Sequence, residues 1–189
     1  MARLTDYTTY ADAHRQFSGP ALWELFDGDR ESLNIAHECV DRHAASGRVA
    51  VRIAHADGRD ETIGFAELSQ WSGRFAHWLS DRGVERGDRV AIMLEPSLAF
   101  YAALFGAIKL GAIAVPLFTL FGPDGVRLRV ADCAPRLLIT NAEKADTARA
   151  GAGIEVIVAD EALLATLKTF PDEYATGSVP DELAVFQYT

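Results

Sequence analysis

The chain of 189 residues is 49% hydrophobic and 24% charged, which is the composition of a globular protein with one domain and a buried core. Its formal net charge of −9 argues against a nucleic-acid surface, because such a surface needs a basic patch. The two cysteines, Cys39 and Cys133, lie far apart and suit a reducing compartment. Residues 1–17 form no basic and apolar leader, so we expect a cytoplasmic protein.

Residues 1–33 are predicted to be an N-terminal extension that packs on the main domain. Four apolar residues in it could form a short helical anchor: Leu22, Trp23, Leu25 and Phe26. From residue 34 to 45, apolar and small side chains recur at helical spacing. Cys39 and His43 would share a face of that helix, but without a second pair of ligands they predict no metal site.

A β-hairpin and a long helix come next. Residues 48–54 alternate apolar and polar side chains, Asp57-Gly58 is a hairpin turn, and residues 61–65 return as the partner strand. We expect this hairpin to close one edge of the main sheet. Residues 65–81 predict an amphipathic helix whose aromatic and aliphatic stripe belongs to the core: Leu68, Trp71, Phe75, Trp78 and Leu79.

Residues 87–117 predict the unit that sets the fold class. Residues 90–94 form a short apolar run, which is typical of a strand buried on both faces. Ser97 can cap a helix over residues 98–110, and Gly111 stands where such a helix ends. Residues 112–115 are a second apolar strand. A strand, a helix and a strand in this order make a right-handed crossover between parallel strands.

A membrane span is the alternative for the apolar stretch from residue 98 to 121. Lys109 lies near its middle and would cost roughly 2.5–3.5 kcal/mol at a bilayer centre. The part without a break covers about 20 Å as a helix, which is shorter than a bilayer core of about 30 Å. We therefore predict a buried helix and no membrane span.

The rest of the chain continues the alternation of helices and strands. Predicted helices cover residues 123–133, 142–150 (ending at Gly151) and 160–168, and predicted strands cover residues 137–140, 154–158 and 183–188. Residues 169–181 are predicted as a loop. The pattern indicates an α/β fold, namely a doubly wound, mostly parallel sheet with helices on both faces, preceded by a β-hairpin.

The usual phosphate-binding motifs are missing from the sequence. No Gly-x-Gly-x-x-Gly follows a strand, and there is no Gly-Lys-Ser/Thr, so a nicotinamide-binding or Walker-type domain is not expected. Glu95 follows a strand but is interpreted as a solvated loop carboxylate. Read from its residues alone, the chain is an open α/β domain without a catalytic set of its own, and no catalytic or metal-binding residue is assigned.

Five stretches of the sequence, in this order, resemble those of a known family. They are Phe65-Ala66-Glu67-Leu68, the run from Val84 to Ile92, the run from Ala107 to Leu117, Leu138-Ile139-Thr140, and Phe186-Gln187-Tyr188-Thr189. In this combination the chain resembles the N-terminal portion of an adenylate-forming acyl-CoA synthetase, from the AMP-binding or acid–CoA ligase superfamily. The similarity extends from about residue 34 to residue 189, which would be one N-terminal α/β subdomain.

The resemblance implies an enzyme that activates a carboxylic acid with ATP to an acyl-adenylate and transfers the acyl group to CoA. ATP, CoA and Mg would serve the parent enzyme, and none is expected to be bound by the fragment. Thr189 matches the opening of the family's ATP-phosphate loop, where backbone N–H groups can cradle phosphates. The family's chemistry lies downstream of that loop, so the fragment alone is expected to be inactive.

Two weaker transfers concern CoA. In relatives that resemble acetyl-CoA synthetase, the loop matching Leu120-Phe121-Gly122 approaches CoA, and a basic residue near Arg149 meets the CoA nucleotide. Arg149 could equally be a solvated cation near a helix end. The alternative to a ligase fragment is a stand-alone α/β binding or interaction module without catalysis. Because a truncated domain exposes apolar surface, we also expect self-association.

Overall fold

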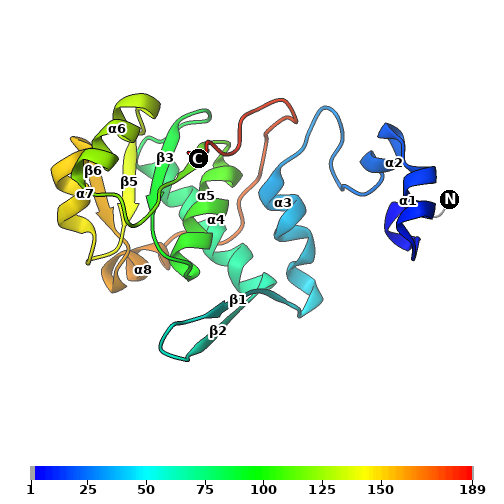
Figure 1. The fold of residues 1–189 in the computed structure, drawn as a ribbon, viewed down its shortest axis with the longest axis horizontal. Coiled ribbons are helices and arrows are strands. Elements are labelled where there is room, and N and C mark those ends of the chain that lie inside the picture. The colour runs from blue at the N-terminus through cyan, green and yellow to red at the C-terminus, as the bar shows by residue number, and fades with distance from the viewer. Residues whose placement is uncertain (1–2, 189) are drawn as a thin grey trace.

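The centre of the protein is a four-stranded parallel sheet, shown by the computed structural model, which describes residues 3–188 (Figure 1). Across the sheet the strands are β4 (Ile113–Pro116), β3 (Arg89–Met93), β5 (Leu137–Thr140) and β6 (Glu155–Val158). Ala91 in the central strand β3 pairs with Val115 on one side and Leu138 on the other. The predicted α/β class with a parallel sheet is confirmed.

Helix α5 (Leu98–Leu110) begins and ends where its flanking residues predict. The Ser97 hydroxyl accepts the Phe100 N–H at 3.2 Å, and Gly111 ends the helix at φ 82°, a conformation that costs glycine little. Like the other helices in residues 3–188, α5 is not both long and apolar enough to cross a bilayer. It is a core helix, and it connects β3 to β4, which lies parallel to β3 in the sheet.

Helices cover both faces of the sheet. Along β3, Val90 and Ile92 point to one face, while Ala91 and Met93 point to the other. The first face is covered by α4 (Phe65–Asp81), α5 and α8 (Glu161–Leu167), and the second by α6 (Pro123–Cys133) and α7 (Ala145–Ala152). This two-layered burial explains why β3 is a continuous apolar run, and it confirms the doubly wound arrangement.

Helix α7 ends two residues later than predicted. Gly153, at φ 63°, is the left-handed residue, and Gly151 lies buried inside the helix. A Cβ atom on Gly151 would lie 2.3 Å from the carbonyl oxygen of Pro123. Gly151 is therefore required by the close crossing of α7 and α6, and not by the end of the helix.

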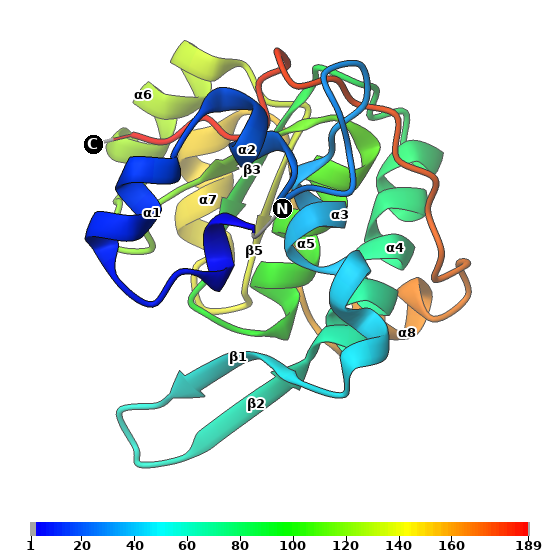
Figure 2. The same ribbon diagram turned by 90° about the vertical axis from the view of Figure 1, so that its right-hand side faces the viewer.

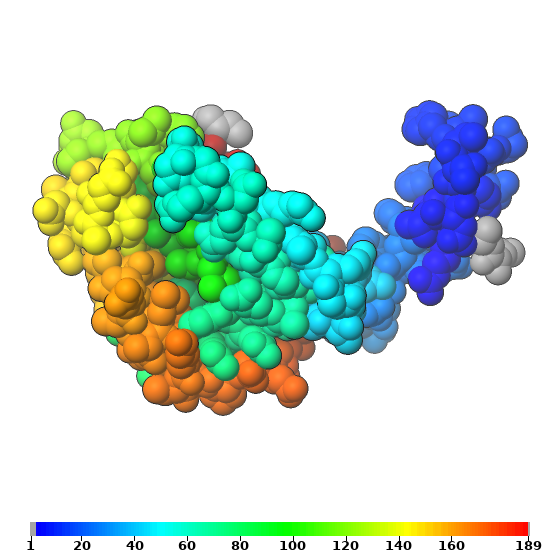
Figure 3. All heavy atoms as spheres, turned by 90° about the horizontal axis from the view of Figure 1, so that it is seen from below, coloured from blue at the N-terminus to red at the C-terminus, as the bar shows by residue number. Residues whose placement is uncertain are grey.

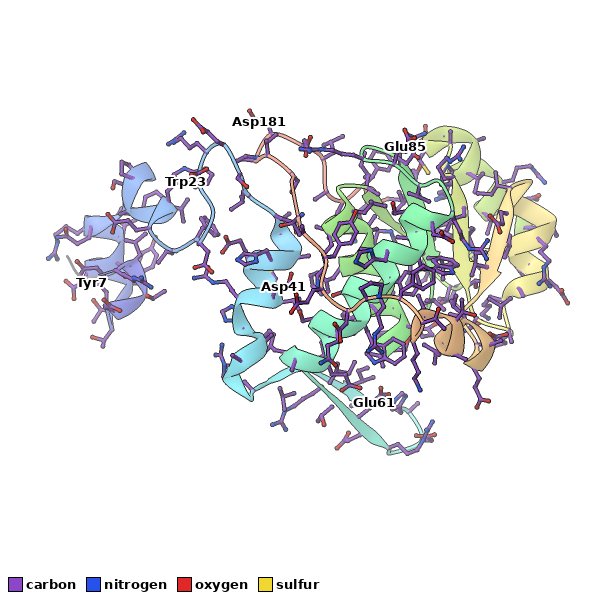
Figure 4. All side chains as sticks on the ribbon, turned by 180° about the vertical axis from the view of Figure 1, so that it is seen from behind. Tyr7, Trp23, Asp41, Glu61, Glu85 and Asp181 are labelled. Carbon is purple, nitrogen blue, oxygen red and sulfur yellow. The ribbon has the colours of Figure 1, made fainter. Side chains whose placement is uncertain are left out.

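The hairpin of β1 (Val49–Ala54) and β2 (Asp60–Gly64) does not extend the main sheet, contrary to expectation. It forms a separate antiparallel sheet that projects from the body (Figure 2; Glu61 is labelled in Figure 4). Ile53 and Ile63 pack with Leu68 of α4 and with Val40. The alternating pattern correctly predicts that one face is buried, but it contains no information about the element that buries it.

The predicted helix over residues 34–45 is broken at Val40, which has φ −127° and ψ −62°. Cys39 ends α3 (Ile35–Cys39), and His43 lies in the 3₁₀ helix η2 (Asp41–Ser46). Within residues 3–188, no three His, Cys, Asp or Glu side chains gather as a metal site would require.

The N-terminal extension divides into two parts. Residues 3–23 form η1 (Leu4–Asp6), α1 (Tyr10–Gln16) and α2 (Gly19–Trp23), an arm that stands apart from the body in Figure 3. The connection is anchored because Glu38 accepts the N–H groups of Asp27 and Gly28, at 3.0 and 2.7 Å. Residues 25–33 therefore pack on the main domain, while docking of the whole extension 1–33 stays a prediction.

The last segment, residues 183–188, lies in parallel beside β4 at the edge of the sheet. Ala114 donates its N–H to the Ala184 carbonyl and accepts the Phe186 N–H, both at 2.9 Å. The predicted strand is thus in the predicted place but is reduced to a single bridge. Before it, residues 168–182 cross back over α4. There, Leu33 and Ser178 exchange two hydrogen bonds, N–H to carbonyl at 3.1 Å and hydroxyl to carbonyl at 2.8 Å.

Candidate ligand cleft at the carboxyl edge of the sheet

A cleft of about 360 Å³ opens where β3 and β4 end. In open α/β sheets, ligands bind outside the carboxyl ends of the strands, so this is the natural place for a site. Three chain segments line the cleft, together with Phe100 of α5. They are residues 94–96 after β3, residues 116–119 with Phe121 at and after the end of β4, and Gln187 with Tyr188 from the last segment.

The floor of the cleft joins the ends of β3 and β4 by a side-chain contact. The Thr119 hydroxyl donates to the Glu95 carboxylate, and Thr119 is buried. Glu95 is exposed, as its interpretation as a loop carboxylate predicts, but it has a specific partner across the cleft. This hydrogen bond joins the loop after β3 to the loop after β4.

Tyr188 also lines the cleft and is held by α6. Its hydroxyl oxygen lies 2.7 Å from Asp132 Oδ2 and 3.2 Å from the Arg129 carbonyl oxygen. Burial raises the pKa of the Tyr188 phenol, and the hydrogen bond to the Asp132 carboxylate raises it further. The phenol therefore stays neutral and acts as a hydrogen-bond donor.

The loop after β4 presents apolar side chains to solvent. Phe118 is 63% exposed and Leu120 is 75% exposed, whereas Phe121 turns inward and lines the cleft. Gly122 accepts the Val126 N–H, so it is the residue from which α6 starts. Exposed aromatic and aliphatic groups on a loop beside a cleft are suited to contact with a ligand or with further polypeptide.

The structure brings together only some of the residues singled out from the sequence. Phe121 lines the cleft, with Leu120 and Gly122 beside it in the chain, and Tyr188 leads to Thr189, which lies outside the described residues. Arg149 lies on α7, away from the cleft lining, and its guanidinium is 3.4 Å from Asp146.

Sequence reasoning missed Arg129, Asp132 and the contact of Glu95 with Thr119. Arg129 and Asp132 share one turn of α6, and their partner Tyr188 is more than fifty residues further along the chain. No spacing rule connects residues so far apart. A strand-end carboxylate such as Glu95 is the one signal that could have directed attention to this edge.

Residues 40–189 match the family described as AMP-binding enzyme. The chain belongs to this family. Its α/β fold and the parallel edge segment before Thr189 agree with that membership, and the expected resemblance to the N-terminal portion of an adenylate-forming enzyme is confirmed.

Similar proteins come from several bacteria. The acetyl-coenzyme A synthetase of Bacillus subtilis (strain 168) is 37% identical over 138 residues, which is 71% of this chain and 24% of the relative. That of Xanthobacter autotrophicus is 42% identical over 112 residues, or 57% of this chain and 17% of the relative. The crystal structure of Brucella canis acyl-CoA synthetase aligns with a TM-score of 0.86 at 26% identity, covering 97% of this chain and 36% of that one. The chain thus spans about a quarter or less of these two curated relatives.

Proposed function

We propose that this chain is the N-terminal part of an acid–CoA ligase, which uses ATP to convert a carboxylic acid to an acyl-adenylate and then passes the acyl group to CoA. The observation that carries the proposal is the match to AMP-binding enzymes over residues 40–189. The cleft at the ends of β3 and β4 supports it, because the segment that leads to Thr189 also lines this cleft. ATP, the acid and CoA would be the substrates, and Mg would accompany ATP as its counter-ion.

On this proposal the cleft supplies one wall of a larger site. The loop of Leu120, Phe121 and Gly122 would lie against CoA, and Thr189 would begin the backbone cradle for the ATP phosphates. Arg149 would meet a phosphate of the CoA nucleotide. Its guanidinium is exposed and forms a surface ion pair with Asp146, which is weak enough to exchange for another partner.

The experiment compares the chain with a longer protein. The 189 residues are assayed for ATP–pyrophosphate exchange with short carboxylic acids, alone and fused after residue 189 to the remainder of the Bacillus subtilis acetyl-coenzyme A synthetase. We expect exchange only from the fusion. Exchange by the chain alone would overturn the division of roles. A well-folded fusion that binds neither ATP nor CoA would favour a binding module without catalysis.

The CoA assignment has its own test within the fusion. Replacing Arg149 with Ala removes a charge-assisted contact to phosphate, so we expect the KM for CoA to rise about tenfold with the KM for ATP unchanged. Asp146→Ala is the matched control, because it removes the partner of Arg149 and leaves the guanidinium in place. Equal effects of both changes would contradict the assignment.

We also infer self-association and a cytoplasmic location. Exposed apolar side chains along the last segment support the first, with Leu183 at 67% exposure. The two free cysteines, Cys39 and Cys133, support the second.

A further inference from the structure

Arg129 is an unusual cation that contacts two of the residues lining the cleft, Phe121 and Tyr188. It projects from α6 and is half-buried, and among residues 3–188 its buried Nε has no hydrogen-bond partner. Its Nη1 makes a long contact of 3.5 Å to the Gly125 carbonyl oxygen. What surrounds the guanidinium is aromatic, because its central carbon lies 4.2 Å from the ring centre of Phe121 and 5.6 Å from that of Tyr188.

The two rings belong to two of the segments that line the cleft. Phe121 ends the loop after β4, and Tyr188 ends the last segment of the chain. The same turn of α6 also receives the Tyr188 hydroxyl, through the Asp132 carboxylate and the Arg129 carbonyl. One helical turn therefore contacts both segments. It stacks on Phe121, and it both stacks on Tyr188 and accepts hydrogen bonds from the Tyr188 hydroxyl.

The last segment is also held by packing of Ala184 and Tyr188 against the core and by a short backbone pairing. Beside the sheet it is held by the two backbone hydrogen bonds to Ala114. Val185 and Phe186 are about 40% exposed, so their burial is incomplete. A stacked guanidinium contributes about 0.5–2 kcal/mol depending on how far it is desolvated, which is a large share of the restraint on a segment paired at a single residue.

We propose that Arg129 is a positioning residue, which sets the separation of the two walls of the cleft by stacking between Phe121 and Tyr188. The effect of Arg129 on activity rests on the proposed function, in which one segment is the loop assigned to CoA and the other leads to the ATP-phosphate cradle. Arginine suits the role because its planar, weakly hydrated guanidinium can stack on aromatic rings, whereas a lysine ammonium is a compact and strongly hydrated point charge.

The first test uses the 189-residue chain and needs no activity. Amide hydrogen exchange of Phe186, whose N–H bonds to Ala114, is measured by NMR for Arg129→Met, Arg129→Lys and the control Arg127→Met. Arg127 lies on the same helix and pairs with Asp124 at the surface. We expect exchange of Phe186 to be about tenfold faster in both Arg129 variants and unchanged in Arg127→Met. Unchanged exchange in Arg129→Met, or a uniform acceleration throughout the sheet, would overturn the proposal.

The second test uses the fusion enzyme. A positioning role predicts that Arg129→Lys lowers kcat/KM for ATP and for CoA together by about tenfold or more, since both walls shift, and that Lys does not rescue the effect of Met. If charge alone mattered, Lys would restore activity, and the proposal would be wrong. Loss of all activity in the unmodified fusion would count against the proposed function only, because the exchange of Phe186 tests the role of Arg129 independently.

Discussion

Gly151 lies where α7 and α6 approach each other too closely for a side chain. On the face of α7 that meets α6, a Cβ atom would lie 2.9 Å from Val126 Cβ and closer still to the Pro123 carbonyl oxygen. Pro123 begins the helix that follows the loop lining the cleft. Any side chain at position 151 therefore pushes on an element that supports the candidate site.

Replacing Gly151 with Ala is expected to lower the free energy of unfolding by about 1–3 kcal/mol, because overpacking outweighs the gain of about 1 kcal/mol in helix propensity. Urea denaturation measures the effect. Gly19→Ala is the control, since that glycine is also helical and has nothing within 4 Å of an added Cβ. An equally stable Gly151→Ala variant would mean that α6 and α7 can separate without cost.

At the scale of elements, a buried ion pair joins three helices. Lys109 of α5 is 2% exposed, and its Nζ lies 2.7 Å from Asp41 Oδ1 and 2.9 Å from the Ser69 carbonyl oxygen of α4. The Ser69 hydroxyl donates to the same Asp41 oxygen at 2.6 Å. Asp41, labelled in Figure 4, starts η2, so this cluster ties α5 and α4 to the segment that follows α3.

Replacing Lys109 with Met leaves the Asp41 carboxylate without its cation. Breaking such a pair costs about 3–5 kcal/mol, and we expect the lower end because the Asp41 side chain is 17% exposed. In a double-mutant cycle, Lys109→Met with Asp41→Leu should be less destabilised than the sum of the single variants. Strict additivity in urea denaturation would show that the pair contributes nothing.

The same lysine makes stability depend on pH. Burial lowers the pKa of Lys109 below its ordinary value of 10.5, although Asp41 opposes the shift. Between the lowered folded pKa and 10.5 the unfolded chain binds more protons, so the contribution of this group to stability rises with pH. The stability of the parent chain relative to Lys109→Met should therefore increase across this alkaline window. A decrease would contradict the sign of the shift.

Elements with local signals were predictable, whereas relations between elements were not. Ser97 and Gly111 define α5 to the residue, because capping is a property of adjacent residues. The hairpin was misplaced, because Ile53 and Ile63 show only that one face is buried. Arg129 and Tyr188 could not be linked from the sequence, because their contact depends on how the sheet is completed.

At the scale of the molecule, the arm meets the body at Trp23, whose ring packs against Phe26 and lies under the Arg30 guanidinium. Helices α1 and α2 form their caps and hydrogen bonds locally, and the body begins where Arg42 donates to the Leu25 carbonyl at 2.9 Å. The Brucella structure covers 97% of this chain, so the likeness includes the arm as well as the body.

Deleting residues 1–24 should change the free energy of unfolding of the body by less than about 0.5 kcal/mol, as for surface changes away from the core. Thermal and urea unfolding of the shortened chain measure this. A deletion that keeps Leu25 retains the contacts of Glu38 and Arg42, so it removes the arm alone. A loss of 2 kcal/mol or more, a large effect for surface contacts, would show that the arm docks on the body in solution.

Self-association should be detectable by light scattering as a mass that rises above 20.5 kDa with concentration. The double variant Leu183→Lys, Val185→Lys places charge on the open sheet edge and should restore the monomer. Val49→Lys, on the similarly exposed hairpin strand β1, is the matched control and should leave the association intact. A wild-type chain that stays monomeric at high concentration would refute the expectation.

The mutual hydrogen bonds of Leu33 and Ser178 have a consequence for synthesis on the ribosome. Asn34 adds bonds from its Nδ2 to Ser178 Oγ at 2.9 Å and to the Ile108 carbonyl at 2.8 Å. Ile108 is 74 positions from Asn34, but Ser178 is 144 or 145 positions from its two partners, so the contacts with Ser178 form only after nearly the whole chain has emerged. At about 5–20 residues per second, translation alone imposes a delay of roughly 7–30 s. During that interval α3 and η2 can be joined to α5 through Ile108 and Lys109, but α3 still lacks its hydrogen bonds to the segment around Ser178.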